Sequence, residues 1–225
     1  KTMRRNISKQ QTIDLIQLHC PPTEVYYRPE IFSLFDDLKK EGKIQNLGVS
    51  VEKVEEALKA IQFDNVSTVQ IIFNMFRQRP SGLFFREAKA KDIGIIARVP
   101  LASGLLTGKF SRTTTFAEGD HRNFNREGKA FDKGETFSGI DYESGLAAVE
   151  RLRAVFPDTP ALATIALMWI LMFPAVSCTI PGASTLDQLQ SNLRASSQPE
   201  LTAHQMEKIR DIYDEQIRPL VHQLW

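Results

Sequence analysis

Short apolar runs alternate with amphipathic segments along the first half of the chain. The apolar runs are rich in β-branched residues and bounded by proline, glycine or charged residues, as expected of strands. They cover residues 12–19, 44–50, 68–74 and 93–100. The segments after the first three runs carry apolar residues at helical spacing and predict helices over residues 29–41, 51–61 and 83–91. Strands that alternate with helices of this length pair in parallel, so the pattern predicts an α/β fold.

The second half of the chain departs from this alternation. Residues 102–142 are rich in glycine and charged side chains, and a loop of this length within a compact domain is usually functional or mobile. A fifth short strand is predicted over residues 177–181, and further helices over residues 143–156, 161–173, 184–196 and 202–218. Thr159 and Pro160 are the expected N-cap and first residue of the second of these helices. The strand spacing suits a (β/α) barrel and a doubly wound sheet equally well.

Charge and composition narrow the class of protein. The 225 residues include 28 Lys and Arg against 27 Asp and Glu, for a formal net charge of +1. This balance gives no electrostatic footprint for nucleic acid or for an anionic membrane surface, so neither partner is expected. The longest apolar run, residues 161–173, is shorter than the roughly 20 residues that span a bilayer and predicts a buried helix instead.

The cysteine and histidine residues do not form a recognisable pattern. Cys20 and Cys178 are too few for a disulfide scaffold and fit a reducing cytoplasm, the expected location, although one bridge between them is also compatible with the sequence. Three histidines, His121, His204 and His222, lack metal-ligand spacing, so no metal site is expected.

Polar side chains lie within or at the ends of the predicted strands. His19 ends the first strand, where barrel enzymes carry catalytic groups, and its imidazole can orient a substrate oxygen. A hydrogen-bonded core histidine is an equally good interpretation of its position. Gln70 lies within the third strand and Arg98 near the end of the fourth, and each needs a polar partner. For both, a partner within the protein is favoured over a ligand.

Residues 100–109 form a glycine-containing segment after the fourth strand. Gly104 and Gly108 allow the backbone to approach a ligand closely, and Lys109 can meet an anion. Phe110 follows the lysine, so the segment is not the phosphate loop of nucleotide hydrolases. The chain also contains no Gly-x-Gly-x-x-Gly, which leaves a Rossmann dinucleotide site without support.

Residues 180–184 lead from the fifth strand into the start of a helix. Free N–H groups and the helix dipole favour a phosphate there. Ser184, Gln188 and Asn192 follow at one-turn intervals and therefore share one helix face. Such a polar stripe is also common on a solvated helix, although barrels often place a phosphate site after their last strands.

Four motifs, in this order along the chain, resemble the aldo-keto reductase family. They are IDLIQLHCPP at residues 13–22, GVS at 48–50, ARVPLASGLLTGK at 97–109 and IPGASTLDQLQSN at 180–192. The likeness extends from about residue 3 to 196 and is to the bacterial, potassium-channel-β-like branch. It implies a (β/α)8 barrel of the TIM type, with about five of eight strands in this chain. Residues 1–225 are then a single barrel domain that lacks its N-terminal strands, and residues 101–142 are a long loop over the cofactor and substrate face.

The resemblance also implies a function and a set of site residues. The expected protein is an NADP(H)-dependent oxidoreductase that reduces aldehydes or ketones to alcohols by hydride transfer. His19 matches the family histidine that polarises the carbonyl oxygen and is the expected catalytic residue. The expected cofactor contacts are Ser50 and Gln70 to the nicotinamide carboxamide, Arg98 against the nicotinamide ring, Leu101, Ser103 and Lys109 to the pyrophosphate, and Gly182, Ser184, Gln188 and Asn192 to the adenosine phosphate.

The sequence departs from the family pattern at three points. Val51 stands where an asparagine or arginine often holds the carboxamide, and the adenosine site lacks the basic residues that many members direct at the 2′-phosphate. NADPH in preference to NADH is therefore expected from the family and not enforced by these residues. The family's aspartate, tyrosine and lysine lie upstream of the histidine and are expected before residue 1.

Two alternatives follow from these departures. One is a nicotinamide-nucleotide-binding regulatory or interaction protein with little turnover, in the manner of the channel-β relatives. His19 argues mildly against it, because the best-known regulatory branch carries asparagine at that position. The other is an inactive fragment. The expected partner is a small carbonyl substrate, and an oligomer is compatible with the sequence.

Overall fold

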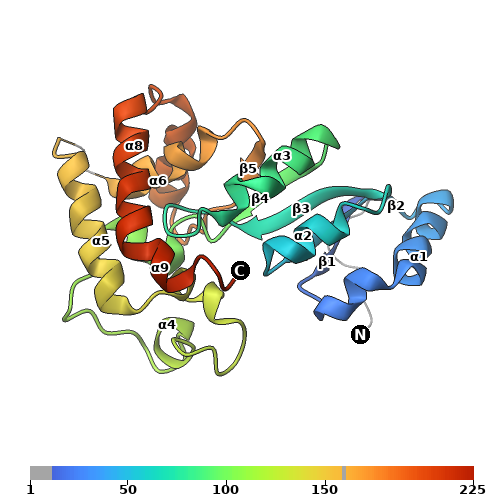
Figure 1. The fold of residues 1–225 in the computed structure, drawn as a ribbon, viewed down its shortest axis with the longest axis horizontal. Helices are drawn as coiled ribbons and strands as arrows, with labels where there is room; N and C mark the ends of the chain where they lie inside the picture. Colours follow the sequence, from blue (N-terminus) through green and yellow to red (C-terminus); the bar gives the residue numbers. More distant parts are fainter. Residues whose placement is uncertain (1–11, 159–160) are drawn as a thin grey trace.

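The computed structural model describes residues 12–158 and 161–225 and shows one parallel five-stranded sheet in the order β1-β2-β3-β4-β5 (Figure 1). The strands are β1 (Ile13–His19), β2 (Ile44–Val51), β3 (Val66–Ile72), β4 (Gly94–Arg98) and β5 (Val176–Thr179). A doubly wound sheet reverses its strand order at a switch point, whereas consecutive barrel units do not. The sequential order therefore confirms the α/β, TIM-barrel-type prediction for these five strands.

The helices follow the predicted pattern closely. They are α1 (Pro29–Lys40), α2 (Val54–Ala60), α3 (Leu83–Ala90), α4 (His121–Phe124), α5 (Tyr142–Val155), α6 (Leu162–Leu171), α7 (Leu186–Arg194), α8 (Ala203–Ile212) and α9 (Arg218–Val221). Short 3₁₀ turns cover Thr23–Tyr27, Arg79–Ser81, Ala102–Thr107, Lys133–Glu135, Phe137–Gly139 and Ala195–Ser197. The predicted N-cap at Thr159 and the proline after it lie outside the described residues.

The last predicted helix, residues 202–218, is not continuous. A π-helical turn at Tyr213–Ile217 separates α8 from α9. Pro219 is the second residue after this turn and lacks the N–H that would continue an α-helical hydrogen-bond ladder. The sequence pattern indicated the helical residues correctly and missed this interruption.

Two predicted boundaries differ because side chains take over backbone hydrogen bonds. β3 ends at Ile72 and not at residue 74, since Asn74 Oδ1 accepts from the Phe76 N–H at 2.8 Å and closes a turn. α2 begins at Val54 and not at residue 51, since the Glu56 carboxylate accepts from the N–H groups of residues 52 and 53 at 3.0 and 3.1 Å.

The two faces of the sheet differ in burial. Leu47, Val49 and Val51 of β2, on the face towards the helices, are fully buried. On the other face Gln17, Gly48 and Thr68 lie side by side in the register of β1, β2 and β3. A Cβ on Gly48 would overlap Thr68 Oγ1, so glycine is required for this close approach. This half-buried, polar face corresponds to the interior of a barrel.

The predicted buried helix is α6, in which six of ten side chains are buried. Trp169 stacks on Phe73 at 4.9 Å between ring centroids and meets Phe173 edge-on at 4.8 Å.

No helix in the described ranges is long and apolar enough to cross a membrane. Both cysteines are free thiols, Cys20 half-buried and Cys178 exposed, so the structure does not contain the single bridge between them.

Candidate nucleotide and active site

The sheet register places three predicted site residues in one row. His19 pairs with Ser50, and Ser50 pairs with Gln70, at the carboxyl ends of β1, β2 and β3. Paired residues of parallel strands direct their side chains to the same face, so all three belong to the inner face of the sheet. His19 is exposed on β1, which is an edge strand of this sheet, whereas Ser50 is fully buried and Gln70 half-buried.

Ser50 is held by two residues that follow β1, Cys20 and Tyr26. Its carbonyl accepts from the Cys20 N–H at 2.8 Å and from the Tyr26 hydroxyl at 3.1 Å. Its hydroxyl oxygen lies 3.5 Å from Cys20 Sγ. These contacts fix the position of Ser50, and a contact of its hydroxyl with a nicotinamide carboxamide stays a prediction.

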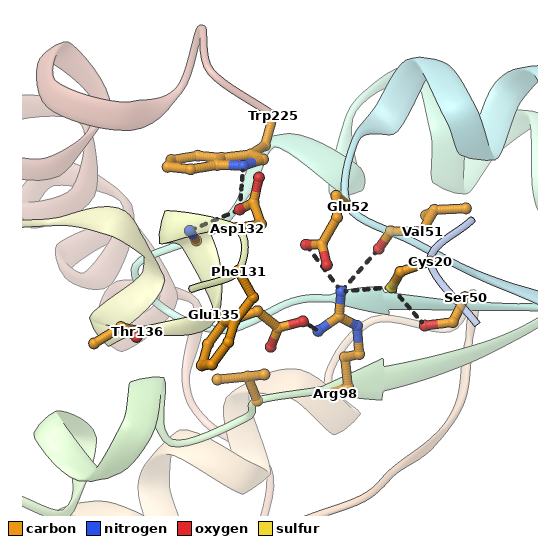
Figure 2. A network of polar contacts seen from close by, with 12 residues as sticks. Cys20, Ser50, Val51, Glu52, Arg98, Phe131, Asp132, Glu135, Thr136 and Trp225 are labelled. Carbon is orange, nitrogen blue, oxygen red and sulfur yellow. Dashed lines mark hydrogen bonds and ion pairs between the residues drawn. The ribbon is translucent and has the colours of Figure 1, made fainter. Parts of the chain in front are cut away.

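Arg98 ends β4 as the centre of a buried polar network (Figure 2). Its guanidinium lies 3.1 Å from Glu52 Oε2, donates to the Val51 carbonyl at 3.0 Å and forms an ion pair with Glu135. Arg98 is only 5% exposed, so the structure shows the ion-paired form and not a free planar face. Stacking on a nicotinamide ring would require this buried side chain to become accessible.

Burial and close charges shift the pKa values in this network. Burial raises the pKa of Glu52 to about 7, with Arg98 opposing this shift and Glu135 adding to it. Burial alone would lower the pKa of Arg98, but Glu135 and Glu52 outweigh that effect and raise it. Burial also raises the pKa of Cys20 to about 11, so its thiol is protonated and poorly nucleophilic at neutral pH.

Three side chains around the Arg98 guanidinium are spaced as the ligands of a metal ion would be. Cys20, Glu52 and Glu135 bring a thiol and two carboxylates within 4.8 Å of one another. Cys20 Sγ lies 3.6 Å from Arg98 Nη2, and both carboxylates are paired with Arg98. The Arg98 guanidinium therefore occupies the position of the positive charge among these three groups.

The raised pKa of Glu52 predicts a pH-dependent stability. A carboxyl group whose pKa is higher in the folded state stabilises the fold while protonated, and this contribution is lost as the pH rises through about 7. Glu52→Gln, which cannot ionise, is expected to match the wild type near pH 5 and to exceed its free energy of unfolding by about 2 kcal/mol near pH 8. Urea unfolding across this pH range measures the difference. Glu55→Gln is the control, because its carboxylate pairs with Arg79 at the surface; an equal gain in both variants would contradict the account.

Residues 132–139 lie against the carboxyl ends of β3 and β4. Asn74 Nδ2 donates to the Val99 carbonyl and to Ser138 Oγ, both at 2.9 Å. Ser103 Oγ donates to the Glu135 carbonyl at 2.9 Å and accepts from the Phe137 N–H at 3.1 Å. The predicted loop over residues 101–142 is thus an ordered segment that contacts predicted site residues.

Most of the residues with strained backbone lie in two segments, residues 99–103 after β4 and residues 132–139. Within residues 12–158 and 161–225, the non-glycine residues with positive φ are Cys20, Asp92, Val99, Ala102, Ser103, Phe137 and Ser138, and Asp92 is the one among them that lies away from the site. A β-branched or bulky residue rarely adopts φ near +52°, the value at both Val99 and Phe137. Such conformations persist where the surrounding contacts impose them, and they are frequent at ligand-binding sites.

A cleft of about 450 Å³ opens between the segment after β4 and the segment after β5. Three predicted cofactor residues, Leu101, Ser103 and Gly182, line it together. The other lining residues are Val99, Pro100, Gly104, His121, Arg122, Glu135 and Ile180.

The remaining predicted cofactor residues lie outside the cleft lining. Lys109 is exposed beyond the segment after β4. Gln188 Oε1 accepts from the Ser184 N–H at 2.7 Å and from its hydroxyl at 3.0 Å, while Asn192 Nδ2 donates to the Gly182 carbonyl at 3.3 Å. Gln188 and Asn192 lie one turn apart on α7 as predicted, whereas Ser184 precedes the helix, because α7 begins at Leu186 with Thr185 as N-cap.

Arg122 is a cleft residue that the sequence did not single out. Its Nε and Nη2 bind the two carboxylate oxygens of Asp120, and its guanidinium lies 4.7 Å from the Phe116 ring centroid. This hydrogen-bonded pairing lowers the pKa of Asp120 to about 2. Arg122 Nη1 has no hydrogen-bond partner within the described part of the chain and would lie 3.6 Å from a Cβ on Gly104. The sequence showed a charged loop here, but only the fold shows which of its charges faces the cleft.

Comparison with known proteins assigns the chain to a protein family. Residues 1–214 match the model described as the aldo/keto reductase family. An uncharacterized oxidoreductase of Bacillus subtilis is 26% identical over 220 residues, covering 95% of this chain and 66% of the relative. An aldo-keto reductase of Schizosaccharomyces pombe whose name specifies NADP(+) is 26% identical over 157 residues, covering 68% of this chain and 44% of the relative.

A comparison with solved structures also finds similar proteins. The glycerol dehydrogenase of Gluconobacter oxydans superposes with a TM-score of 0.69 at 26% identity, covering 92% of this chain and 60% of that protein. The chain thus spans 44–66% of the length of these proteins. The potassium-channel-β-like branch stays a prediction. The chain belongs to the aldo/keto reductase family.

Proposed function

We propose that the protein is an NADP(H)-dependent oxidoreductase that reduces aldehydes or ketones to alcohols. The observation that carries the proposal is the position of the cleft. Leu101, Ser103 and Gly182 line it together, beside the carboxyl end of the sheet. The inner face of the sheet carries the row of His19, Ser50 and Gln70 at the same end. An extended dinucleotide can lie along this edge with its nicotinamide near the row and its adenosine towards α7.

The residues around the cleft fit the phosphates of such a nucleotide. A Cβ on Gly182 would meet nothing within 4 Å, so the backbone there is open to a ligand. Arg122 Nη1 lies beside Gly104 with no partner in the structure as described, and α7 begins just beyond Gly182. A guanidinium and free helix N–H groups are the groups that bind phosphate in proteins.

His19 has the position required for its proposed role. The nucleotide supplies a hydride when it is bound. An exposed imidazole at the end of β1 can donate a hydrogen bond to a carbonyl oxygen and orient it, which makes the carbonyl carbon more electrophilic. In the family, a tyrosine delivers the proton, and that residue is expected upstream of residue 1.

The proposed activity can be tested directly. The whole protein, mixed with NADPH and a small aldehyde, is expected to oxidise the nucleotide at a rate that depends on the aldehyde concentration. The loss of NADPH absorbance measures this rate. Binding of NADPH without turnover would favour the alternative of a nucleotide-binding regulatory protein, and the absence of both would contradict the proposal.

Arg122 provides a specific test of nucleotide binding. Arg122→Leu is expected to raise the Kd for NADPH by about 10-fold or more, because it removes a charged donor that faces the cleft. Arg112→Leu is the matched control, since Arg112 lies on the same segment and its exposed side chain pairs with Glu143. A loss confined to NADPH would indicate contact with the 2′-phosphate, and an equal loss for NADH would indicate the pyrophosphate. Equal affinities of both variants would contradict the role of Arg122.

A further inference from the structure

Trp225 is a buried side chain that neither the sequence motifs nor the proposed reaction uses. It is 5% exposed, and its indole N–H donates to Asp132 Oδ1 at 2.8 Å (Figure 2). The same carboxylate oxygen accepts from the Gly134 N–H at 2.7 Å. Trp225 is thereby connected to the start of the segment of residues 132–139.

Two glycines of this segment form a cradle for the indole ring. A Cβ on Gly139 would overlap Trp225 Cη2, and one on Gly134 would lie 2.9 Å from Cε2. Gly139 has a φ of +83° and follows two non-glycine residues in the left-handed region, Phe137 and Ser138. A strained backbone of this kind needs contacts from outside to hold it, and the indole ring supplies them here.

Arg77 also contacts the indole ring, next to Gly134. Its guanidinium carbon lies 4.0 Å from the ring centroid, and Arg77 itself is 3% exposed. Arg77 Nη2 donates to the Glu52 carbonyl at 2.8 Å, while Nη1 has no hydrogen-bond partner in the described residues. Burial lowers the pKa of Arg77 to about 9. The indole face is therefore a principal contact of a buried charge that has few other partners.

The clamped segment reaches the candidate site at two points. Glu135 lines the cleft and pairs with Arg98 at the end of β4. The Glu135 carbonyl and the Phe137 N–H both bond to the hydroxyl of Ser103, a predicted pyrophosphate contact. Trp225 therefore contacts the back of a segment whose front is one wall of the cleft.

We propose that Trp225 is a positioning residue that holds residues 132–139 closed against the ends of β3 and β4 and thereby preforms this wall. The inference rests on the proposed function only in naming a nicotinamide nucleotide as the ligand. A preformed wall lowers the ordering cost of binding, so Trp225 sets nucleotide affinity and does not take part in the chemical step.

Amide hydrogen exchange of the nucleotide-free protein tests the clamp itself. Trp225→Ala is expected to speed exchange in residues 133–140 by at least about 10-fold and to leave β2, β3 and β4 unchanged. Trp225→Phe keeps the ring on Arg77 and loses the N–H, so a smaller increase in the same segment is expected. Asp132→Ala should reproduce that smaller increase. Leu224→Ala is the matched control, because Leu224 is next to Trp225 in the chain and its own side chain is 47% exposed.

Kinetics of the whole protein test the consequence for the site. Trp225→Ala and Trp225→Phe are expected to raise the KM for NADPH, by about 10-fold in the alanine variant, while kcat changes less than about twofold. A side chain needed only for stability would not separate the two constants in this way. Exchange at the wild-type rate in both Trp225 variants would overturn the clamp, and faster exchange with an unchanged KM would overturn the positioning role. Local faster exchange in a protein that binds no NADPH would support the clamp and contradict only the proposed function.

Discussion

His19→Ala is expected to lower kcat for carbonyl reduction by about 100-fold or more while changing the Kd for NADPH less than about twofold. The imidazole lies exposed at the end of β1, where it can polarise a substrate oxygen, and removal of such a group typically costs two to four orders of magnitude in rate. Steady-state kinetics of the whole protein, with the Kd from nucleotide fluorescence, separate the two effects.

His204→Ala is the control for this experiment. His204 is exposed on α8 and does not line the cleft, so its removal is expected to leave both constants unchanged. His19→Gln retains a donor and is expected to keep part of the activity. Wild-type turnover in His19→Ala would show that the residue has no catalytic role.

Gly139→Ala is expected to lower the free energy of unfolding by about 3 kcal/mol. The residue has a φ of +83°, which an alanine adopts with strain, and an added methyl group overlaps the Trp225 ring. The ring contacts Arg77 and its N–H donates to Asp132, so it cannot move away from Gly139 without breaking these contacts. Urea unfolding followed by circular dichroism measures the change.

Two other glycines separate backbone strain from overlap. Gly42 has a φ of +68° and open space around its Cβ position, so Gly42→Ala is expected to cost only about 1 kcal/mol. Gly119 has open space and no positive φ, so Gly119→Ala is expected to be neutral. A loss at Gly139 no larger than at Gly42 would contradict the close packing of Trp225.

The sequence predicted much of the framework because its periodic pattern is strong there. Apolar runs and helical spacing gave five strands and most helices, with errors where Asn74 closes a turn and where Pro219 follows the π-helical turn. The family resemblance assigned His19 and Gln70 to one site, and the register of β1, β2 and β3 brings them into one row.

The rest of the site lies in a segment without periodicity. Residues 101–142 contain no long helix or strand, so the sequence could not show that Arg122 faces the cleft or that Glu135 pairs with Arg98. The contact between Asp132 and Trp225 joins residues 93 positions apart through side chains alone. Contacts of this kind depend on the completed fold and leave no local signal in the sequence.

Titration of the protein with NADPH, followed by the fluorescence of the nucleotide, tests the central claim most directly. The account predicts saturable binding in the micromolar range that NADP+ displaces and that Arg122→Leu weakens about 10-fold, while Arg112→Leu binds as the wild type does. The absence of saturable binding, or binding that is equally strong in Arg122→Leu, would contradict a nucleotide site in the cleft between residues 99–104 and 180–182.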